Sequence, residues 1–555
     1  MLPITDLLAS LSSSPNAWTQ PNLMSEPQTL ALATATMIAV LSATAWFVSA
    51  ASSPKLLTSD GKPLKPRELP RPPNTLPVMG DMLTILSNQE RYYSWIHELC
   101  ANFNYKPWRL EIPGQPSTIV LSSAEQFEEV MTKKTGRFDK GQVQIDQIRD
   151  FIGDNLVSSV GEPWYHQRKT ATKFFSARSL NAYMASSARR NLTQIMDILH
   201  THQENGTSVN LSSLIFDFTL QSFVETGVGV KLDWIGRKEP HPFQVAIDEA
   251  SDLIAKRLRM PTWLWRVMRT LNVGYEAKLA SHMSYIMSWL ANIVNEGLEA
   301  QAAKKNGAPN ANDEPEAKSV IELFIENSRD DLDGMRADDL VDFIRVMLIG
   351  ARDTTAITLA WFFYEISKNP RVENKIREEL HRVYPTRAGK SSEYFSPQET
   401  RPLVYLEATI KETLRLHSPS GENRREVTED TVICGDALVR KGEFIILSGY
   451  SAARNPKVWG PDATVFKPER WIDETTGELR QFTNTTFFSF GAGPRLCVGK
   501  GLAMLELRAV TCNFLSRFHF QLDESVGGDF GISFLYNLKD PVIAKVFPAS
   551  VLSQK

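Results

Sequence analysis

The chain has 555 residues, a formal net charge of −3 and 42% hydrophobic residues. This length allows two to four domains or one large catalytic domain, and the hydrophobic fraction is sufficient for a large core. The near-neutral charge gives no indication of a nucleic-acid partner. The four cysteines form no Cys-x-x-Cys pair, which argues against a disulfide framework and against a structural zinc site.

The N-terminal region predicts a polar tail followed by a membrane anchor. We expect residues 1–28, rich in Ser, Pro and Asn, to be disordered. Residues 29–51 carry no charge and are long enough to span a bilayer with some tilt. Because lysines and arginines follow, the positive-inside rule places the rest of the chain in the cytosol. A cleaved signal peptide is the alternative, since residues 48–50 are small enough for cleavage, but the long apolar run without a basic start favours an uncleaved anchor.

The remaining chain divides into a hinge and one long domain. Residues 52–80 are dense in proline and predict a stiff, non-helical connection. Residues 81–555 show mainly helical periodicity with short strand signals and predict one long domain. The clearest local predictions are a strand at 117–123, helices at 125–134, 178–203 and 274–303, and an exposed loop at 304–319.

Trp164 and Arg168 are four residues apart, so both lie on one face of a predicted helix. By itself the pair is equally typical of an amphipathic surface helix. Further along, residues 402–417 predict a helix that contains Glu412 and Arg415, and Arg470 follows about fifty residues later. A Glu–Arg pair at this spacing is common on helix surfaces and is a weak signal alone.

Residues 336–368 predict a helix about 50 Å long that is apolar nearly all round from Leu340 to Ile349, as expected of a buried helix. Its middle reads Gly350-Ala351-Arg352-Asp353-Thr354-Thr355. The two small residues open a groove for a ligand, and Asp353 and Thr354 are suited to relay protons to it. The alternative is a helix kink with a local threonine back-bond.

Near the C-terminus, Cys497 stands before a predicted helix over residues 498–518. The N-terminus of a helix favours a thiolate. Arg495 can reach an anionic substituent of a bound group, and Phe490 is placed to shield the sulfur from water. Glycines leave room beside the sulfur for a large flat group; they are Gly491, Gly493 and Gly499.

A lone thiolate in such a dry loop suits the axial bond to a haem iron. The alternative is a buried cysteine in a glycine-rich turn. The loop resembles the cysteine-ligand signature of the cytochrome P450 family, Phe-x-x-Gly-x-Arg-x-Cys-x-Gly, at every fixed position. Residues 350–355 resemble the family's oxygen-binding helix motif, although this chain has Gly-Ala where Ala-Gly is usual.

The resemblance implies a mainly α fold with a smaller β region and a haem b whose iron is bound by Cys497. It also implies that Trp164 and Arg168 bond a haem propionate, with Arg424 or Arg425 as a further donor. The haem-contacting loop residues are then Phe490, Arg495, Cys497 and Gly499. The family's ion-pair network, which braces this loop, corresponds to Glu412, Arg415 and Arg470.

The implied reaction inserts one oxygen atom of O2 into a C–H bond of a lipophilic substrate. Because only 58 residues follow Cys497, we expect electrons to come from NADPH through NADPH-cytochrome P450 reductase. Basic residues near the thiolate suggest its docking face; they are Arg495, Lys500 and Arg508. The expected location is the endoplasmic-reticulum membrane, with a single span in contact with membrane lipid and a cytosolic catalytic domain.

A weaker resemblance concerns the substrate. Residues 136–141, 164–169 and 350–355 are similar to the family branch that hydroxylates long-chain fatty acids and alkanes at the chain end. Family position predicts substrate contacts from residues 138–158, 343–354, 418–422 and 532–536. Two other functions stay open at this point: a peroxide-rearranging haem-thiolate enzyme and a non-catalytic haem-binding sensor.

Overall fold

The computed structural model describes residues 68–176, 187–306, 319–324, 337–387 and 394–549. The predicted tail, the predicted membrane segment and most of the predicted hinge lie outside these residues. The same is true of most of the predicted loop 304–319 and of the beginning of the helix predicted at 178–203.

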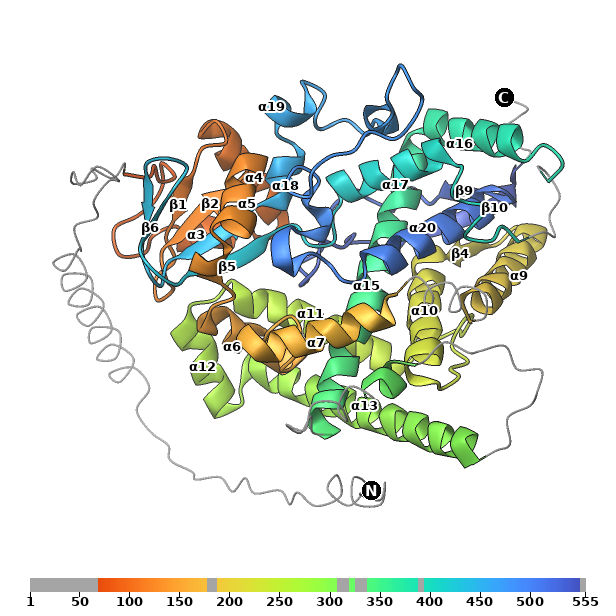
Figure 1. Cartoon of the computed structure of the whole chain (residues 1–555), viewed down its shortest axis with the longest axis horizontal. Coiled ribbons are helices and arrows are strands. Elements are labelled where there is room, and N and C mark those ends of the chain that lie inside the picture. Colours follow the sequence, from red (N-terminus) through yellow and green to blue (C-terminus); the bar gives the residue numbers. More distant parts are fainter. Residues whose placement is uncertain (1–67, 177–186, 307–318, 325–336, 388–393, 550–555) are drawn as a thin grey trace. The chain divides into compact units, whose positions relative to one another are not determined.

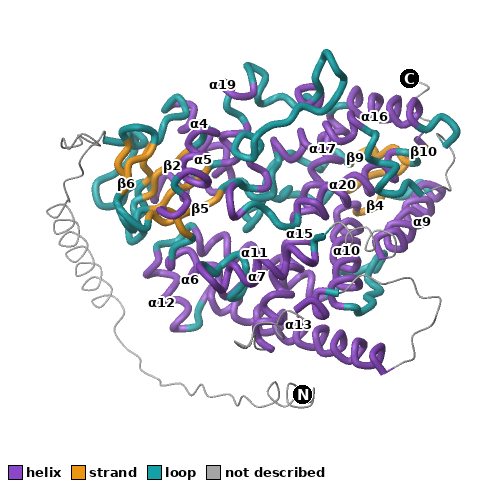
Figure 2. The backbone as a smooth tube through the Cα atoms, in the orientation of Figure 1, coloured by secondary structure: helices purple, strands orange, loops and turns teal. Residues whose placement is uncertain are grey.

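Helices make up most of the described chain, and the short strands gather in two separate areas (Figures 1 and 2). The mainly α fold with a smaller β region is therefore confirmed. The helices are α3 (Met82–Ser87), α4 (Tyr92–Asn102), α5 (Ala124–Glu128), α6 (Gln142–Ile152), α7 (Gly161–Phe174), α9 (Arg189–Asn205), α10 (Leu211–Phe223), α11 (Pro242–Leu258), α12 (Thr262–Leu271), α13 (Gly274–Asn306), α15 (Ala337–Lys368), α16 (Pro370–Val383), α17 (Val404–Leu416), α18 (Gly449–Ala453), α19 (Pro456–Trp459) and α20 (Lys500–Leu515).

Helix α15 is the helix predicted for residues 336–368, and α10, α17 and α20 pack against it (Figure 1). Its apolar side chains from Leu340 to Ile349 are buried. Among the described helices, this one is long and apolar enough to cross a membrane, but 89% of its most apolar window is buried, as in a core helix. It ends at Lys368 because Pro370 starts α16 at that helix's first position.

The larger sheet has the strand order β1-β2-β8-β5-β3. Its strands are β1 (Trp108–Leu110), β2 (Thr118–Leu121), β3 (Phe138–Asp139), β5 (Asn423–Val427) and β8 (Phe444–Leu447). Strand β2 falls within the predicted segment 117–123 and pairs in parallel with β8. A second sheet joins β4 (Ser208–Asn210), β10 (Ile543–Pro548) and β9 (Phe518–Leu522).

Residues 427–435, which follow Arg425, do not form one continuous strand. Strand β5 begins earlier and contains both Arg424 and Arg425, which face Ile446 and Ile445 of β8 across the sheet. A separate hairpin of β6 (Thr431–Ile433) and β7 (Ala437–Val439) follows. Because side chains alternate along a strand, the two arginines point to opposite faces of the sheet.

The helix predicted at 125–134 is interrupted. A capping box of Ser123 and Gln126 starts α5 in the predicted place. After Glu128 the backbone widens into a π-helical turn, η2 (Glu129–Lys133). This turn presents the carbonyl oxygen of Met131 toward the loop that carries Cys497.

Three clusters of buried hydrophobic residues fill the described part of the chain. One surrounds the C-terminal half of α15 with α17 and α20, and another joins its N-terminal half to α10, α11 and α13. The third lies at the larger sheet. The loop that carries Cys497 touches all three, because Phe490 packs on the first, Val498 on the second and Ala492 on the third.

Candidate active site

Cys497 lies between the short helical turn η8 (Gly493–Arg495) and α20. Its backbone N–H donates to the carbonyl oxygen of Phe490 at 2.9 Å, which closes the loop. Burial raises the pKa of the Cys497 thiol above its ordinary value. The backbone N–H groups of Gly499 and Lys500, which form hydrogen bonds with the sulfur, and the nearby Arg168 act in the opposite direction.

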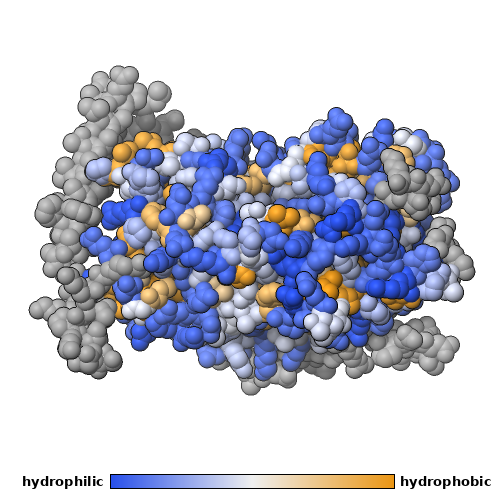
Figure 3. Space-filling model, turned by 90° about the horizontal axis from the view of Figure 1, so that it is seen from above, coloured by the Kyte–Doolittle hydropathy of each residue, from blue (hydrophilic) through white to orange (hydrophobic). Residues whose placement is uncertain are grey.

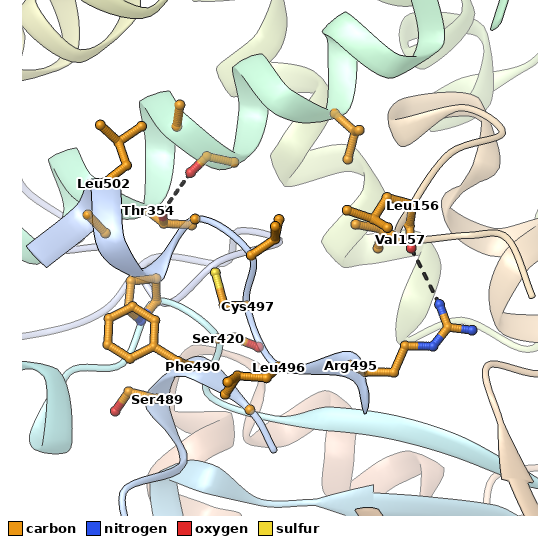
Figure 4. Close-up of a pocket in the computed structure, with 18 of the residues that line it drawn as sticks. Leu156, Val157, Thr354, Ser420, Ser489, Phe490, Arg495, Leu496, Cys497 and Leu502 are labelled. Carbon is orange, nitrogen blue, oxygen red and sulfur yellow. Dashed lines mark hydrogen bonds between the residues drawn. The ribbon is translucent and has the colours of Figure 1, made fainter. Parts of the chain in front are cut away.

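A cavity of about 320 Å³ separates the Cys497 loop from α15. Figure 4 shows the sulfur of Cys497 directed into it, with Thr354 on the wall formed by α15. The Cys497 side chain is exposed, and this exposure is toward the cavity. Gly350 and Ala351 also line the cavity, and nothing lies within 4 Å of the position where a Cβ of Gly350 would be. A groove is therefore open above the sulfur.

The three glycines of the loop have different roles. Gly491 and Gly499 line the cavity, but Gly493 does not. Gly493 has a φ of 65°, and a Cβ at this position would overlap the carbonyl oxygen of Met131 in η2. The prediction that Gly493 leaves room for a bound group is therefore wrong, because this glycine is required by close backbone packing.

Replacing Gly493 by alanine is expected to lower the free energy of unfolding by about 2–5 kcal/mol, since backbone strain and steric overlap add. The matched control is Gly477→Ala. Gly477 has a similar φ of 72° but open space around it, so only about 1–2 kcal/mol is expected there. Denaturant unfolding measures both values. Equal losses in the two variants would mean that the contact with Met131 contributes nothing.

Trp164 and Arg168 of α7 and Arg495 of the loop line the same cavity. The guanidinium group of Arg495 lies 4.2 Å from the centre of the Trp164 ring. Arg495 donates to the carbonyl oxygen of Ser159 at 3.0 Å, and Arg168 donates to that of Leu496 at 2.9 Å. The structure thus brings Arg495 next to Trp164 and Arg168, which precede it by more than 300 residues in the sequence.

The cavity has an excess of positive charge. Lys140, Arg168, Arg425 and Arg495 line it, and none of its lining residues is Asp or Glu. The carboxylate of Asp139 lies 3.7 Å from Arg495. Burial and the neighbouring Arg495 lower the pKa of Arg425 to about 10. Basic residues in excess over carboxylates, beside a largely apolar cavity that holds a thiol, suit the two carboxylates and the flat body of a haem, so the residues present fit that group.

Of the two arginines that the sequence left open, Arg425 lines the cavity. Arg424 faces the other side of β5 and pairs with Glu422 at 2.9 Å. Lys140 also lines the cavity. The sequence included it in the predicted substrate segment 138–158 but did not single it out as a basic residue of the site. Burial, together with Arg425 and Arg495, holds the pKa of Lys140 well below its usual range. Lys140 directly follows the short strand β3, and it belongs to residues 136–141, which carry the resemblance to the fatty-acid and alkane branch.

The structure does not bring Asp353 and Thr354 into one cavity. Thr354 lines the cavity, and its hydroxyl donates to the carbonyl oxygen of Gly350 at 2.6 Å, so α15 continues without opening. Asp353 is buried and pairs with Arg352 at 2.5 Å, and Arg352 in turn pairs with Asp248 of α11 at 2.8 Å. Burial raises the pKa of Asp353 to about 6, against the effect of Arg352.

Glu412, Arg415 and Arg470 form one network behind the loop. Glu412 is fully buried and accepts hydrogen bonds from Arg415 at 2.8 Å and from Arg470 at 3.2 Å. The indole of Trp471 and the backbone N–H of Lys467 donate to the same carboxylate, both at 2.9 Å. The network therefore ties α17 to the segment around residue 470.

One of the three basic residues predicted to form a docking face is directed into the molecule. Arg495 lines the cavity, which contradicts that prediction. Arg508 pairs with Glu407 of α17 at 2.9 Å. Lys500 lies over the ring of Phe490, with its amine 5.5 Å from the ring centre.

Comparisons with known proteins agree with this geometry. The sequence matches the family described as Cytochrome P450 over residues 70–530. Cytochrome P450 monooxygenase cyp1 of Mycosarcoma maydis is 30% identical over 458 residues, which cover 81% of this chain and 69% of that protein. Cytochrome P450 704B1 of Arabidopsis thaliana is 28% identical, and cytochrome P450 94A2 of Vicia sativa is 26% identical. Each of these two alignments covers 80% of this chain, and they cover 89% and 85% of the relatives. The chain therefore belongs to the cytochrome P450 family and is an oxygen-incorporating oxidoreductase of that family.

Proposed function

We propose that this protein inserts one oxygen atom of O2 into a C–H bond of a long-chain fatty acid or a related lipid, at or near the chain end. In this proposal the thiolate of Cys497 would bind the iron of haem b. The observation that carries it is the Cys497 sulfur in an apolar cavity with four lining cations and no lining carboxylate. When bound, a haem with a thiolate ligand supplies the oxygen-activating chemistry.

The chain's own residues hold and orient that group. Arg168, Arg425 and Arg495 bind its propionates through charge-assisted hydrogen bonds, and Trp164 keeps Arg495 in place by stacking on its guanidinium group. Phe490 excludes water from the sulfur. The network around Glu412 holds the segments behind the loop in a fixed position.

Protons are delivered along α15 in this proposal. Thr354 holds a water in the groove beside Gly350, where its hydroxyl oxygen still has a free lone pair after donating to the helix. Asp353 connects this region to the surface through Arg352 and the exposed Asp248. A rotation of the Asp353 side chain away from Arg352 is needed before it can resupply the water near Thr354.

Thr354→Ala is expected to lower product formed per NADPH, by up to about 10²-fold, and to divert reducing equivalents to peroxide. Haem content and the spectral change on substrate binding should stay intact, because neither needs a proton. Thr354→Ser is the matched control, since it keeps the hydroxyl and should keep the coupling. Unchanged coupling in Thr354→Ala would assign the threonine to helix structure alone.

The walls of the cavity support a lipid substrate. Leu156, Val157, Val346 and Met347 line it and come from two segments that family position predicts to contact substrate. The similarity of residues 136–141, 164–169 and 350–355 to the fatty-acid and alkane branch supports the same class. Apolar walls offer a C–H bond an environment without competing polar groups.

The test is a panel of fatty acids, alkanes and alcohols added to the purified protein, with the haem spin-state change as the measure of binding. Turnover with NADPH and NADPH-cytochrome P450 reductase, the proposed electron donor, then identifies the product. Fatty acids should bind to the purified protein alone, and they should be hydroxylated only when reductase, NADPH and O2 are all present. Rearrangement of a lipid peroxide without reductase would instead favour the peroxide-rearranging alternative.

We further propose that residues 29–51 anchor the protein in the endoplasmic-reticulum membrane with the catalytic domain in the cytosol. Surface hydrophobicity supports a second lipid contact. Figure 3 shows a mainly hydrophilic face with hydrophobic residues in separate patches. Exposed apolar side chains flank the turn between β1 and β2 on both sides; they are Leu76, Val78, Leu83 and Leu86 on one side and Trp263, Val267 and Leu271 on the other.

Alkaline carbonate extraction should leave the full chain in the membrane pellet. Removing residues 1–51 should release only part of the protein, because the exposed apolar side chains still contact lipid. Asn205, in the sequon Asn205-Gly206-Thr207, reports the orientation, since it is exposed whereas Asn191 of the other sequon is buried. Glycosylation of Asn205 in cells would place the domain in the lumen and contradict the proposal.

A further inference from the structure

A second cavity of about 240 Å³ adjoins the one above Cys497. The two share the lining residues Lys140, Val157, Ser420 and Asn423. The second cavity lies among α4, α6, the C-terminal end of α11 and the segments 420–424 and 533–535. It therefore continues the substrate space away from the sulfur.

The second cavity has an apolar wall and a polar end. The apolar side chains come from four segments; they are Ile148, Val157, Ala255, Leu258, Phe534 and Leu535. The polar end is formed by Tyr92, Glu422, Arg424 and Arg259. This combination is typical of sites for molecules with a hydrocarbon body and one polar group.

At the polar end of the second cavity, positively charged side chains outnumber negatively charged ones. Glu422 pairs with Arg424 at 2.9 Å and accepts a hydrogen bond from the Tyr92 hydroxyl at 3.2 Å, so its charge is compensated. The guanidinium group of Arg259 lies 5.1 Å from the centre of the Tyr92 ring. Its Nη1 atom is buried and has no hydrogen-bond partner among the residues that the structure describes. Arg259 is thus a surplus cation with an unsatisfied donor.

Arg259 also caps the C-terminus of α11, where a cation favours the helix dipole. That role requires a charge near the last turn but does not account for an Nη1 that is buried without a partner in a residue that lines the second cavity. Leaving such a donor unpaired is costly, and an anion placed there removes the cost.

We propose that Arg259 binds the carboxylate of the substrate, with the acyl chain passing Lys140 and Val157 into the cavity above Cys497. The two Nη groups of an arginine match a carboxylate in a bidentate arrangement. Fixing the acid end at a distance from the sulfur presents the far end of the chain for reaction. This inference rests on the proposed function and names the residue that selects acids and sets the hydroxylated carbon.

The experiment measures binding to the full-length holoprotein by calorimetry, with dodecanoic acid and methyl dodecanoate as probes. Arg259→Gln should weaken binding of the acid about ten- to hundredfold and change binding of the ester less than twofold. Arg259→Lys should retain part of the affinity for the acid. In turnover, Arg259→Gln should move hydroxylation from the chain end to several inner carbons.

The matched control is Arg266→Gln. Arg266 also lies over an aromatic ring, 5.6 Å from the centre of Trp265, but it is exposed and outside the cavity. It should leave acid and ester binding unchanged. Equal weakening of acid and ester by Arg259→Gln, or no weakening of either, overturns the inference while the fatty-acid proposal stands. A wild-type protein that binds neither probe overturns both.

Discussion

Cys497→Ser is expected to abolish the long-wavelength Soret band of the reduced carbonyl complex and to reduce monooxygenase activity to background. The Cys497 sulfur is directed into the cavity opposite α15, where a thiolate can reach a bound iron. A serine hydroxyl at this position stays protonated and lacks the electron donation of a thiolate. Absorption spectroscopy of the reduced, carbon-monoxide-treated protein measures the change directly.

Cys434→Ser is the control for this variant. Cys434 is half-buried in the turn after β6 and has a φ of 54°. Serine and cysteine tolerate this backbone conformation equally, so the replacement adds no backbone strain. Cys100 and Cys512 are fully buried in the core, so their replacement would change stability as well as chemistry. The control should keep the band, and a Cys497→Ser protein that also keeps it would refute the ligand assignment.

Much of the fold could be predicted because apolar residues recur at helical spacing along the whole length of its long helices. α15 was expected over 336–368 and occupies Ala337–Lys368, since an apolar run followed by Pro370 defines both its burial and its end. The π-helical turn after Glu128 could not be predicted in this way. Its sequence has ordinary helical spacing, and the widened backbone is accompanied by packing of Met131 against the distant Gly493.

The site was predicted where residues are fixed by local spacing. The loop 490–499 keeps its cysteine and arginine in one short segment, and Glu412 and Arg415 are one helical turn apart. The register of the strands could not be predicted from the sequence. The sheet faces on which the side chains of Arg424 and Arg425 lie depend on the pairing of β5 with β8 and β3. Arg259 lacked any sequence signal, since its cavity is assembled from distant segments.

The direction of the Asp353 side chain could not be predicted from the sequence either, although this residue lies inside a helix. Consecutive helical residues differ by about 100° in direction; Thr354 and Thr355 line the cavity, whereas Asp353, on the other side of Thr354, does not. Arg352 forms ion pairs with Asp248 of α11 and with Asp353. The contact with α11 thus holds Arg352 where it can pair with Asp353 outside the cavity. The pairing of Arg352 with Asp248 is a tertiary contact over 104 residues and has no counterpart in local sequence.

Glu412→Gln is expected to lower the free energy of unfolding by about 3–5 kcal/mol. The change keeps the size and shape of the side chain but removes the negative charge between Arg415 and Arg470, whose side chains are 1% and 9% exposed. Arg415 then has no carboxylate partner, although it still donates to the carbonyl oxygen of Ala463. A buried cation without its counter-ion is costly because the protein interior cannot replace the lost hydration.

Glu407→Gln provides the matched control on the same helix, α17. Glu407 also pairs with an arginine, Arg508 at 2.9 Å, but both side chains are 17% exposed and reach solvent. Partly exposed pairs of this kind contribute about 0–1 kcal/mol. Denaturant unfolding of the two variants, followed by haem absorbance and by tryptophan fluorescence, should therefore separate them by at least about 2 kcal/mol. Equal stabilities would mean that the hydrogen bonds from Trp471 and Lys467, which a glutamine oxygen can still accept, hold the network together without the charge.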